Sequence, residues 1–371
     1  MERHERTDSS RRAWRFAVAL AVTAVALVGC GSDDDDDATT TTDPVEQVES
    51  TEPAPETTAP PAETTEAPRE DTEPAAEQAE EAGDTVTVTD ATGEITVPLT
   101  SRDVLALDEY TAVNLLSLGV TPIRAVNFFQ LGEVDAILEA EGIDVFTGAP
   151  FTPNLEELSR SDASLIAGFN FPTIVEVRDT LDDEIAPTVL VDFLNDDWRA
   201  HLALLASVTG TGDRLEELED SVDSAIEELA ADIAAAGLDG ATVSYLEETA
   251  GGISLSGSGR LAPSILERVG LARPAVEQVE GTGVISELSE ETLGDHDAEF
   301  MIVETDLSTE PTVNDSPLRT ADGVKVYVYG WSEDVVGSFR IIADLRRVLL
   351  DGAEPLGPDD QLEIWDEFVA P

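Results

Sequence analysis

The chain of 371 residues contains one cysteine, Cys30, so it cannot form an internal disulfide bond. Packing and hydrogen bonds alone must therefore hold its core together. Basic residues are also scarce: 20 Lys and Arg stand against 79 Asp and Glu, and Lys325 is the only lysine. Phosphate backbones require a basic surface, so this composition excludes a nucleic-acid partner.

The single cysteine follows an apolar run and precedes five aspartates. Five arginines come before the run, at Arg3, Arg6, Arg11, Arg12 and Arg15. A cationic start followed by an apolar stretch of about a dozen residues, here 16–28, predicts an export signal. The run is shorter than the ~20 residues of a membrane-spanning helix.

The segment Leu27-Val28-Gly29-Cys30 resembles the bacterial lipobox. The resemblance implies a signal peptide over 1–29, acylation of Cys30 and attachment of the mature chain to the extracytoplasmic face of the membrane. An ordinary signal peptide with a chance cysteine is the alternative. Ser10-Arg11-Arg12 leaves twin-arginine export open beside the general export route.

Large apolar residues are rare in 31–84, where 19 acids accompany one base, Arg69. Such a segment cannot bury enough surface to offset its ordering entropy, so we expect a disordered tether over 30–84. Repulsion and prolines favour an extended chain that holds a domain away from the membrane. A low-complexity tail without a role is the alternative.

Acidity continues through residues 85–371, which contain 57 acids and 14 bases. Charge spread this widely is typical of a solvated surface adapted to salt, although a site for cations is the alternative.

Apolar runs alternate with helical patterns in this second part, which is long enough for two lobes. The segment "TVTVTDATGEITVP" predicts a hairpin that turns at 91–93. Strands separated by helices predict a mainly parallel sheet. From 213 to 236, apolar residues recur every three or four positions and predict one long helix, which Gly237 and Gly240 end. The alternation of strands and helices then restarts.

We therefore expect an α/β fold of two lobes, each with a mainly parallel sheet flanked by helices. Lobe one covers about 85–210, the bridging helix about 213–236 and lobe two about 240–371.

Five segments in this order resemble the periplasmic-binding proteins of iron–siderophore and cobalamin uptake. They are "VLALDEYTAVNLLSLGVTPI", "PNLEELSRSDASLIAG", "SGSGRLAPSILERVGL", "LSEETLGDHDAEFMIV" and "GWSEDVVGSFRIIADLRRVL". The resemblance covers roughly 101–369 and implies the class III periplasmic-binding fold and service to an ABC importer. The chain departs from the family at Ser161-Asp162-Ala163, where the family has Lys-Pro-Asp.

The family docks on its importer through one acidic residue in each lobe, and the matching positions are Glu156 and Glu291. Two distant carboxylates on one edge would fix the orientation of docking and favour fast encounter. Both glutamates also lie in first helical turns, after Asn154 and Ser289, where acids stabilise the helix end. The two interpretations are compatible.

Ligands of parallel sheets bind at the carboxyl ends of the strands, so the loops there carry the candidate binding residues. These are Asp108, Glu109, Tyr110, Asn127, Phe128, Phe129, Phe169, Asn170, Phe171, Glu247, Glu248, Thr249, Glu304, Thr305 and Trp331. We select Trp331, Tyr110, Phe128, Phe169 and Glu248, with Trp331 favoured because the family has an aromatic residue there. Flat, partly apolar chelates suit aromatic walls, although hinge or core packing is the alternative for each Phe.

Arg260 is a sixth candidate, because a planar guanidinium pairs well with an anionic chelate. The alternative is a surface arginine that neutralises acidic neighbours.

Metal ligation by the protein itself is not expected, since His201 and His296 are far apart in sequence and His4 lies in the leader. Tyr327 and Tyr329 share a strand face, where tyrosines more often pack than bind ferric iron. We expect iron to arrive already chelated and the protein itself to hold no cofactor.

The leading hypothesis is a monomeric lipoprotein that captures a ferric siderophore and delivers it to the membrane subunits of an ABC importer. Cobalamin or haem is the alternative cargo, and a wall-associated lipoprotein without transport is another class. An enzyme is not expected, because the chain lacks a G-x-S-x-G turn, a P-loop and an HExxH motif.

Overall fold

The computed structural model describes residues 84–371 except 131, 194–196, 250–251, 282–283, 286–287, 289–292, 306–323, 330, 333 and 358–359. The predicted signal peptide, Cys30 and all of the predicted tether except Asp84 lie outside the described residues. In the part of the chain described, no helix is both long enough and apolar enough to cross a bilayer.

The described chain begins with the predicted hairpin. Strands β1 (Thr85–Asp90) and β2 (Gly93–Pro98) pair antiparallel, with Thr85 opposite Pro98. The carboxylate of Asp90 accepts the backbone N–H groups of Thr92 at 2.8 Å and Gly93 at 3.1 Å, and Gly93 takes a φ of +133°, which favours glycine. The Asp90 carboxylate also accepts the N–H of Leu190, and so ties the hairpin to the first lobe.

The first lobe is built on a five-stranded sheet in the order β5-β4-β3-β6-β7, with every neighbouring pair parallel. Its strands are β3 (Val104–Ala106), β4 (Arg124–Val126), β5 (Val145–Phe146), β6 (Leu165–Phe169) and β7 (Thr188–Val191). The strands β3, β6 and β7 are almost wholly buried, which is why their sequences read as continuous apolar runs.

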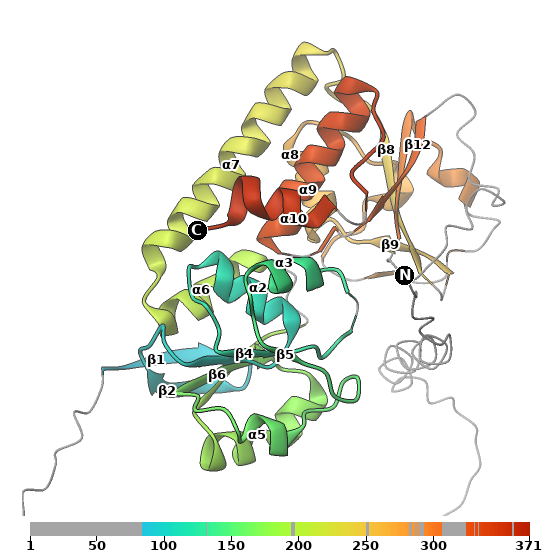
Figure 1. Cartoon of the computed structure of the whole chain (residues 1–371). Coiled ribbons are helices and arrows are strands. Elements are labelled where there is room, and N and C mark those ends of the chain that lie inside the picture. The colour runs from blue at the N-terminus through green and yellow to red at the C-terminus, as the bar shows by residue number, and fades with distance from the viewer. Residues whose placement is uncertain are drawn as a thin grey trace, which may run out of the picture. The chain divides into compact units, whose positions relative to one another are not determined.

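Among the described residues, five helices follow these strands along the chain. They are α2 (Glu109–Ser117), α3 (Asp135–Ala140), α4 (Leu155–Leu158), α5 (Pro172–Glu184) and α6 (Trp198–Thr209). Figure 1 shows α5 on one side of the sheet and α2, α3 and α6 on the other. Because helices cover both faces of the sheet, a ligand can reach it only at the loops beyond the carboxyl ends of the strands.

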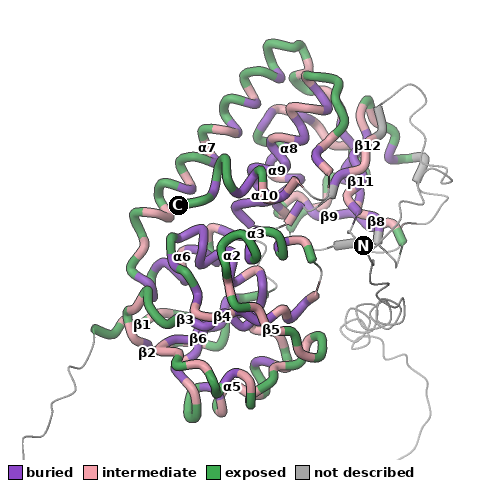
Figure 2. Tube along the Cα trace, in the orientation of Figure 1, coloured by how far each residue is buried: buried purple, intermediate pink, exposed green. Residues whose placement is uncertain are grey.

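Helix α7 (Gly212–Ala235) links the first sheet to the second, within one residue of the predicted range at each end. Its buried stripe consists of Leu218, Val222, Ile226, Leu229 and Ile233. Figure 2 shows that the rest of its surface is largely exposed. A continuous helix of this kind resists bending, so it favours small movements of the lobes over a wide hinge.

The second sheet has the order β10-β9-β8-β11-β12. Its strands are β8 (Val243–Thr249), β9 (Gly252–Ser256), β10 (Val284–Ile285), β11 (Phe300–Thr305) and β12 (Val324–Tyr329). The strands β8, β11 and β12 are parallel, but β9 returns antiparallel to β8, and β10 is antiparallel to β9. Two of the four pairings are thus parallel, so this sheet is more mixed than the mainly parallel one that we expected for lobe two.

The helical segments of the second lobe are α8 (Leu261–Arg268), α9 (Val335–Leu345), α10 (Gln361–Ile364) and the wider turns η3 (Arg346–Asp351) and η5 (Trp365–Val369). Short 3₁₀ turns lie at η1 (Ala275–Glu277) and η2 (Leu293–His296). The C-terminal segment returns to the first lobe, where the Trp365 indole N–H donates to the Glu141 carboxylate at 2.8 Å. The fold-class prediction, two α/β lobes bridged by a long helix, is confirmed.

Candidate functional site

The carboxyl ends of the five parallel strands of lobe one share a single edge, and six phenylalanines cover it. Phe169 is the last residue of β6, and the others follow β4 (Phe128 and Phe129), β5 (Phe151), β6 (Phe171) and β7 (Phe193). We call them the phenylalanine cluster. The Phe129 and Phe193 rings stack with centroids 5.7 Å apart, and the Phe151 and Phe171 rings stack at 5.3 Å. Most of the other contacts are edge-to-face, the geometry that aromatic rings prefer.

Exposure within the cluster is graded. Phe128 is 2 % exposed and Phe129 is also buried, whereas Phe193 is 40 % exposed. Phe169 and Phe171 are half-buried. The burial of Phe128 favours the packing interpretation for that ring, while Phe169 and Phe193 retain surface that an apolar ligand could contact.

Two buried carboxylates at the start of α2 hold the aromatic loops in place. The Glu109 carboxylate accepts three consecutive backbone N–H groups, from Phe128 at 2.8 Å, Phe129 at 3.1 Å and Gln130 at 2.8 Å. Asp108 caps α2 by accepting the N–H of Thr111 at 2.6 Å, and it also accepts the N–H of Phe169 at 3.1 Å. The carboxylates of these two candidate ligand residues therefore bind backbone N–H groups rather than facing a ligand. In this way they position the loops that follow β4 and β6.

Burial dominates the titration of both acids. It raises the pKa of Asp108 to about 6 and the pKa of Glu109 to about 7, although the amide donors oppose the shift. Each carboxyl is therefore partly protonated near neutral pH.

Tyr110 lies beside this pair and at the meeting point of the lobes. Its hydroxyl donates to the Glu133 carboxylate at 2.6 Å, and its ring contacts Phe129 edge-on with centroids 5.6 Å apart. Burial and the acids Glu133, Glu109 and Asp334 raise the pKa of Tyr110 well above its usual value. Because Asp334 comes from lobe two, the carboxyl edges of the two lobes approach each other here.

The lobe-two edge contains the candidate Trp331, which follows β12. Its ring stacks on Tyr245 with centroids 5.7 Å apart, and its indole N–H donates to the Asp344 carboxylate at 2.8 Å. Trp331 is 3 % exposed. In this conformation Trp331 packs in the hydrophobic core, and its role in ligand binding stays a prediction.

Asp344 connects Trp331 to the C-terminal segment. Its second oxygen accepts the N–H of Leu356 at 2.6 Å, while the buried Arg340 donates to the carbonyls of Leu356 and Gly357 and to the Gln361 side chain. Burial raises the pKa of Asp344 and lowers the pKa of Arg340. The tryptophan is thus one end of a buried polar network.

Two further candidates lie elsewhere on lobe two. Glu248 is buried near the end of β8. Arg260 is half-buried at the N-cap of α8, which follows β9, so it does not follow the carboxyl end of a parallel strand. The structure does not bring Arg260 and the phenylalanine cluster together in any contact that it describes.

Glu156 lies on the first turn of α4, and its side chain is 81 % exposed beside Arg160, with 2.6 Å between the charged atoms. Asn154 caps the same helix. Glu156 is thus available to a partner, and its docking role stays a prediction. Glu291 and Cys30 lie outside the described residues.

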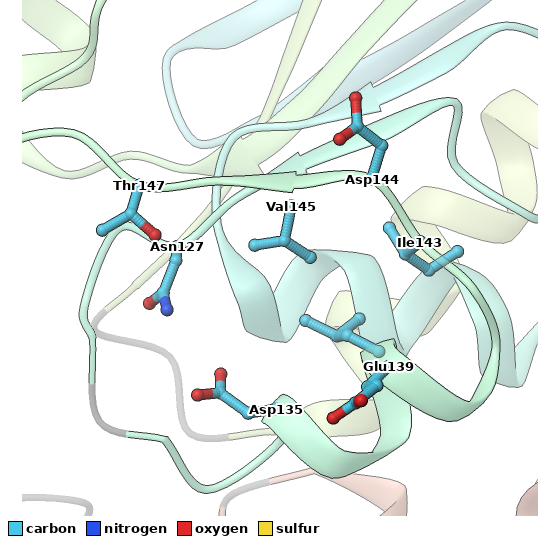
Figure 3. A pocket seen from close by; sticks show the side chains of 8 residues that line it. Asn127, Asp135, Glu139, Ile143, Asp144, Val145 and Thr147 are labelled. Atoms are coloured by element: carbon cyan, nitrogen blue, oxygen red, sulfur yellow. The ribbon is translucent and has the colours of Figure 1, made fainter. Parts of the chain in front are cut away.

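A pocket of about 450 Å³ lies between α3 and the edge strand β5 (Figure 3). Asn127 and Thr147 come from the carboxyl ends of β4 and β5. The rest of the lining consists of Asp135, Leu138, Glu139, Ile143, Asp144 and Val145. Figure 3 shows Asn127 and Asp135 directed toward the same space. The described lining contains three acids, one amide, one threonine and three apolar side chains, and no base.

The histidines have structural partners. One His201 ring nitrogen lies 3.1 Å from the Asp192 carbonyl, and its ring meets Phe169. His296 pairs at 2.9 Å with the buried Glu277, which also accepts from Ser244, Tyr245 and Arg273. Among the described residues, no three His, Cys, Asp or Glu side chains are grouped to hold a metal ion.

Sequence reasoning did not identify Phe151 or Phe193 as site residues. Each is the only phenylalanine in its loop. It contacts the other phenylalanines only because the ends of four strands lie side by side in the folded sheet. Phe193 directly follows the carboxyl end of β7 with Asp192, so the rule used for the other loops could have found it.

Two α/β lobes joined by one helix, with an aromatic edge where the strands end, define a solute-binding protein. Residues 64–322 match the family of periplasmic binding proteins, and the chain belongs to that family. Members of this family work outside the cytoplasmic membrane and bind solutes. No curated protein is similar enough in sequence to serve as a relative.

Several solved structures share the fold. SirA of Staphylococcus aureus, solved with staphyloferrin B, has 21 % sequence identity and a TM-score of 0.59, covering 71 % of this chain and 98 % of its own. FhuD of S. pseudintermedius has 16 % identity and a TM-score of 0.58, with 72 % and 98 % coverage. FeuA of Bacillus subtilis, a triscatecholate siderophore binding protein solved with ferri-bacillibactin, has 15 % identity and a TM-score of 0.55, with 70 % and 95 % coverage.

Proposed function

We propose that this protein captures a ferric siderophore outside the cell membrane and delivers it to an ABC importer. The observation that carries the proposal is the phenylalanine cluster at the carboxyl edge of lobe one, in a chain of the periplasmic binding protein family. A wall of rings with graded exposure suits a bulky, partly apolar chelate. The iron would arrive already coordinated by the chelator, so the protein would not need to supply metal ligands.

Structures with the same fold support this choice of cargo, since SirA and FeuA were solved with staphyloferrin B and ferri-bacillibactin. The lipobox-like segment at Cys30 supports a lipid anchor, and the acidic segment 31–84 would then serve as the tether. The protein would act as a monomer that meets the importer through its two lobes.

Titration of the purified full chain in detergent with ferric siderophores, haem and cobalamin tests the proposed cargo. The described tryptophans are Trp198, Trp331 and Trp365, all buried, and a coloured ferric chelate nearby should quench their fluorescence. We expect saturable quenching by at least one ferric siderophore, with a dissociation constant of ~1 µM or lower, equivalent to about −8 kcal/mol. Preferential binding of haem or cobalamin would show that the cargo is not a ferric siderophore. If the folded protein bound none of these ligands, a wall-associated lipoprotein without transport would be favoured.

Removing both predicted docking acids, Glu156→Ala with Glu291→Ala, should separate capture from delivery. We expect unchanged affinity for the chelate and at least ~10-fold slower iron uptake by cells, because charge pairs govern the encounter with a partner. A control variant, Glu176→Ala with Glu184→Ala, removes two exposed acids of α5 and should leave uptake unchanged. Normal uptake by the first variant would show that these acids do not dock the importer.

A further inference from the structure

Polar side chains fasten the loops that carry the phenylalanine cluster to one another. Glu109 accepts backbone N–H groups of the loop after β4, and Asp108 accepts the N–H of Phe169 at the end of β6. Two further side chains, Gln130 and Asn170, make bonds of the same kind between neighbouring loops. Each of these four side chains therefore binds the backbone of a loop or strand end that carries a phenylalanine.

Gln130 joins the loop after β4 to the loop after β5. Its backbone N–H donates to Glu109 at 2.8 Å, and its side-chain amide donates to the carbonyl of Gly148 at 3.0 Å. In the return direction, the N–H of Phe151 donates to the carbonyl of Phe128 at 3.1 Å. Hydrogen bonds in both directions thus hold the two loops together, with the rings that they carry.

Asn170 joins the end of β6 to the segment after β7. Its side-chain oxygen accepts the N–H of Phe193 at 2.8 Å, and its side-chain amide donates to the Asp192 carboxylate at 3.2 Å. Phe193 has the most exposed ring of the cluster. The bond from Asn170 therefore fixes the backbone of the ring that offers most surface to a ligand.

Two residues of these loops have a backbone conformation that is costly for residues other than glycine. Among the described residues, three non-glycine residues have a positive φ: Asp103 at 56°, Gln130 at 59° and Phe151 at 56°. Such conformations persist only where surrounding contacts impose them, and they concentrate at functional sites. Two of the three lie in adjacent loops of the aromatic edge, whereas Asp103 precedes β3 at the opposite end of the sheet.

We propose, on the basis of the proposed function, that Gln130 and Asn170 are positioning residues of the ligand site. They bind the backbone of adjacent loops, and so hold the phenylalanine cluster in its binding arrangement before the ferric siderophore arrives. Both side chains are hydrogen-bonded to protein groups, so they contribute to affinity through the arrangement of the rings rather than through a bond to the chelate. A site arranged in advance does not have to order its loops when the ligand binds.

Positioning has a kinetic signature that a direct ligand contact lacks. If the rings hold their arrangement only part of the time, only that fraction of the protein can bind, and the association rate falls by the same factor. Loss of a direct contact raises the dissociation rate instead, as most interface substitutions do. Stopped-flow quenching of tryptophan fluorescence measures both rates on the full chain in detergent. The probe is the ferric siderophore of highest affinity in the titration described above.

Gln130→Gly is the first test. Glycine adopts the positive φ without strain, but the substitution withdraws the bond to Gly148 and lets the backbone leave this conformation. We expect ~10-fold slower association, equivalent to ~1.4 kcal/mol and similar to the cost of ordering the backbone of one residue, with nearly unchanged dissociation. The midpoint of urea unfolding should change little, because relief of strain offsets the lost bond and the greater freedom of the unfolded chain.

Asp103→Gly is the matched control. It places glycine at a positive φ of similar size, but at the amino end of β3 and away from the rings. The control should change neither rate. Equal slowing of association by Asp103→Gly and Gln130→Gly would overturn the inference, because it would show that the effect does not depend on the aromatic loops.

Asn170→Ala tests the second positioning residue on a different loop. It removes the acceptor of the Phe193 N–H and should slow association by ~3-fold, again with nearly unchanged dissociation. Asn170 does not have a positive φ, so this variant tests the inference independently of backbone strain and also if Gln130→Gly does not fold.

The possible outcomes separate this inference from the proposed function. Slower association in Gln130→Gly and Asn170→Ala, with Asp103→Gly unaffected, supports the inference. Faster dissociation in these variants would show that the side chains contact the chelate, and unchanged rates would show that they do not arrange the rings. Either result would overturn the inference and leave siderophore capture intact. Failure of every ferric siderophore to bind the folded parent protein would remove the proposed function, and the inference with it.

Discussion

Glu109→Ala is expected to lower the free energy of unfolding by about 4 kcal/mol, because it removes the acceptor of three backbone N–H groups at once. Leaving a buried donor unsatisfied costs ~1–3 kcal/mol, and the amides of Phe128, Phe129 and Gln130 all depend on this carboxylate. The loop after β4 should loosen with the substitution. Urea unfolding followed by circular dichroism measures the loss, and hydrogen exchange at residues 128–130 localises it.

Two other variants serve as references for the effect of Glu109→Ala on the free energy of unfolding. Glu109→Gln keeps an oxygen for Phe129 and Gln130 but turns an amide donor toward Phe128, so it should cost about 1–2 kcal/mol. Glu176→Ala removes an exposed glutamate and should stay within about 0.5 kcal/mol of the parent. If Glu109→Ala were no worse than Glu176→Ala, the carboxylate would not hold the loop.

The same residue should make stability depend on pH. The pKa of Glu109 is raised from 4.5 to about 7, so between these values the folded chain holds a proton that the unfolded chain has lost. The stabilising contribution is complete below about pH 4.5 and is lost as the pH rises through about 7, with an upper limit of about 3 kcal/mol. Asp108 contributes in the same direction, between about 3.8 and 6.

Unfolding at pH 5.5 and pH 7.5 checks the sign of this linkage. The parent should be more stable at the lower pH, and Glu109→Gln should reduce the difference because the amide does not titrate. General repulsion among the many acids also weakens at low pH, but it acts on both proteins. An equal pH effect in the two would show that Glu109 does not carry the linkage.

The elements of this fold could be predicted because their signals are local. The apolar stripe of α7 and the alternation that forms the hairpin of β1 and β2 each occupy one continuous stretch. The structure places α7 within a residue of its expected range and turns the hairpin between Asp90 and Gly93. The direction of β9 was not predictable, since its sequence at 252–255, "GISL", would show the same apolar pattern in a parallel or an antiparallel strand. Only the pairing with β8 decides it.

The site was less predictable, because its residues acquire their roles through distant contacts. Asp108 and Glu109 were identified as loop residues that could face a ligand, but Asp108 accepts from an amide 61 positions away and Glu109 from amides about 20 positions away. The phenylalanine cluster likewise depends on four strand ends that meet only in the folded sheet. The sequence identifies which residue types are available, whereas the topology decides which of them support the site and which remain exposed.

Trp331→Ala is the second substitution for which we expect a large effect. From the structure we expect it to lower the free energy of unfolding more than the affinity for the ligand. As an exposed ligand wall, Trp331 would change mainly the dissociation constant. A side chain that is 3 % exposed, stacked on Tyr245 and bonded to Asp344, is instead part of the core. Its removal leaves a large cavity and an unsatisfied carboxylate oxygen, so we expect a loss of ~3–5 kcal/mol of unfolding free energy.

Trp331→Phe isolates the hydrogen bond, because it keeps a ring against Tyr245 but withdraws the donor from Asp344. Trp198→Phe is the matched control: Trp198 is similarly buried, and its indole N–H has no hydrogen-bond partner among the described residues. Both variants lose similar volume, so the excess cost at Trp331, expected at ~1–3 kcal/mol, measures the bond to Asp344. Equal costs at the two sites would show that Asp344 does not depend on Trp331. A loss of chelate affinity by Trp331→Phe without loss of stability would instead place the indole against the ligand.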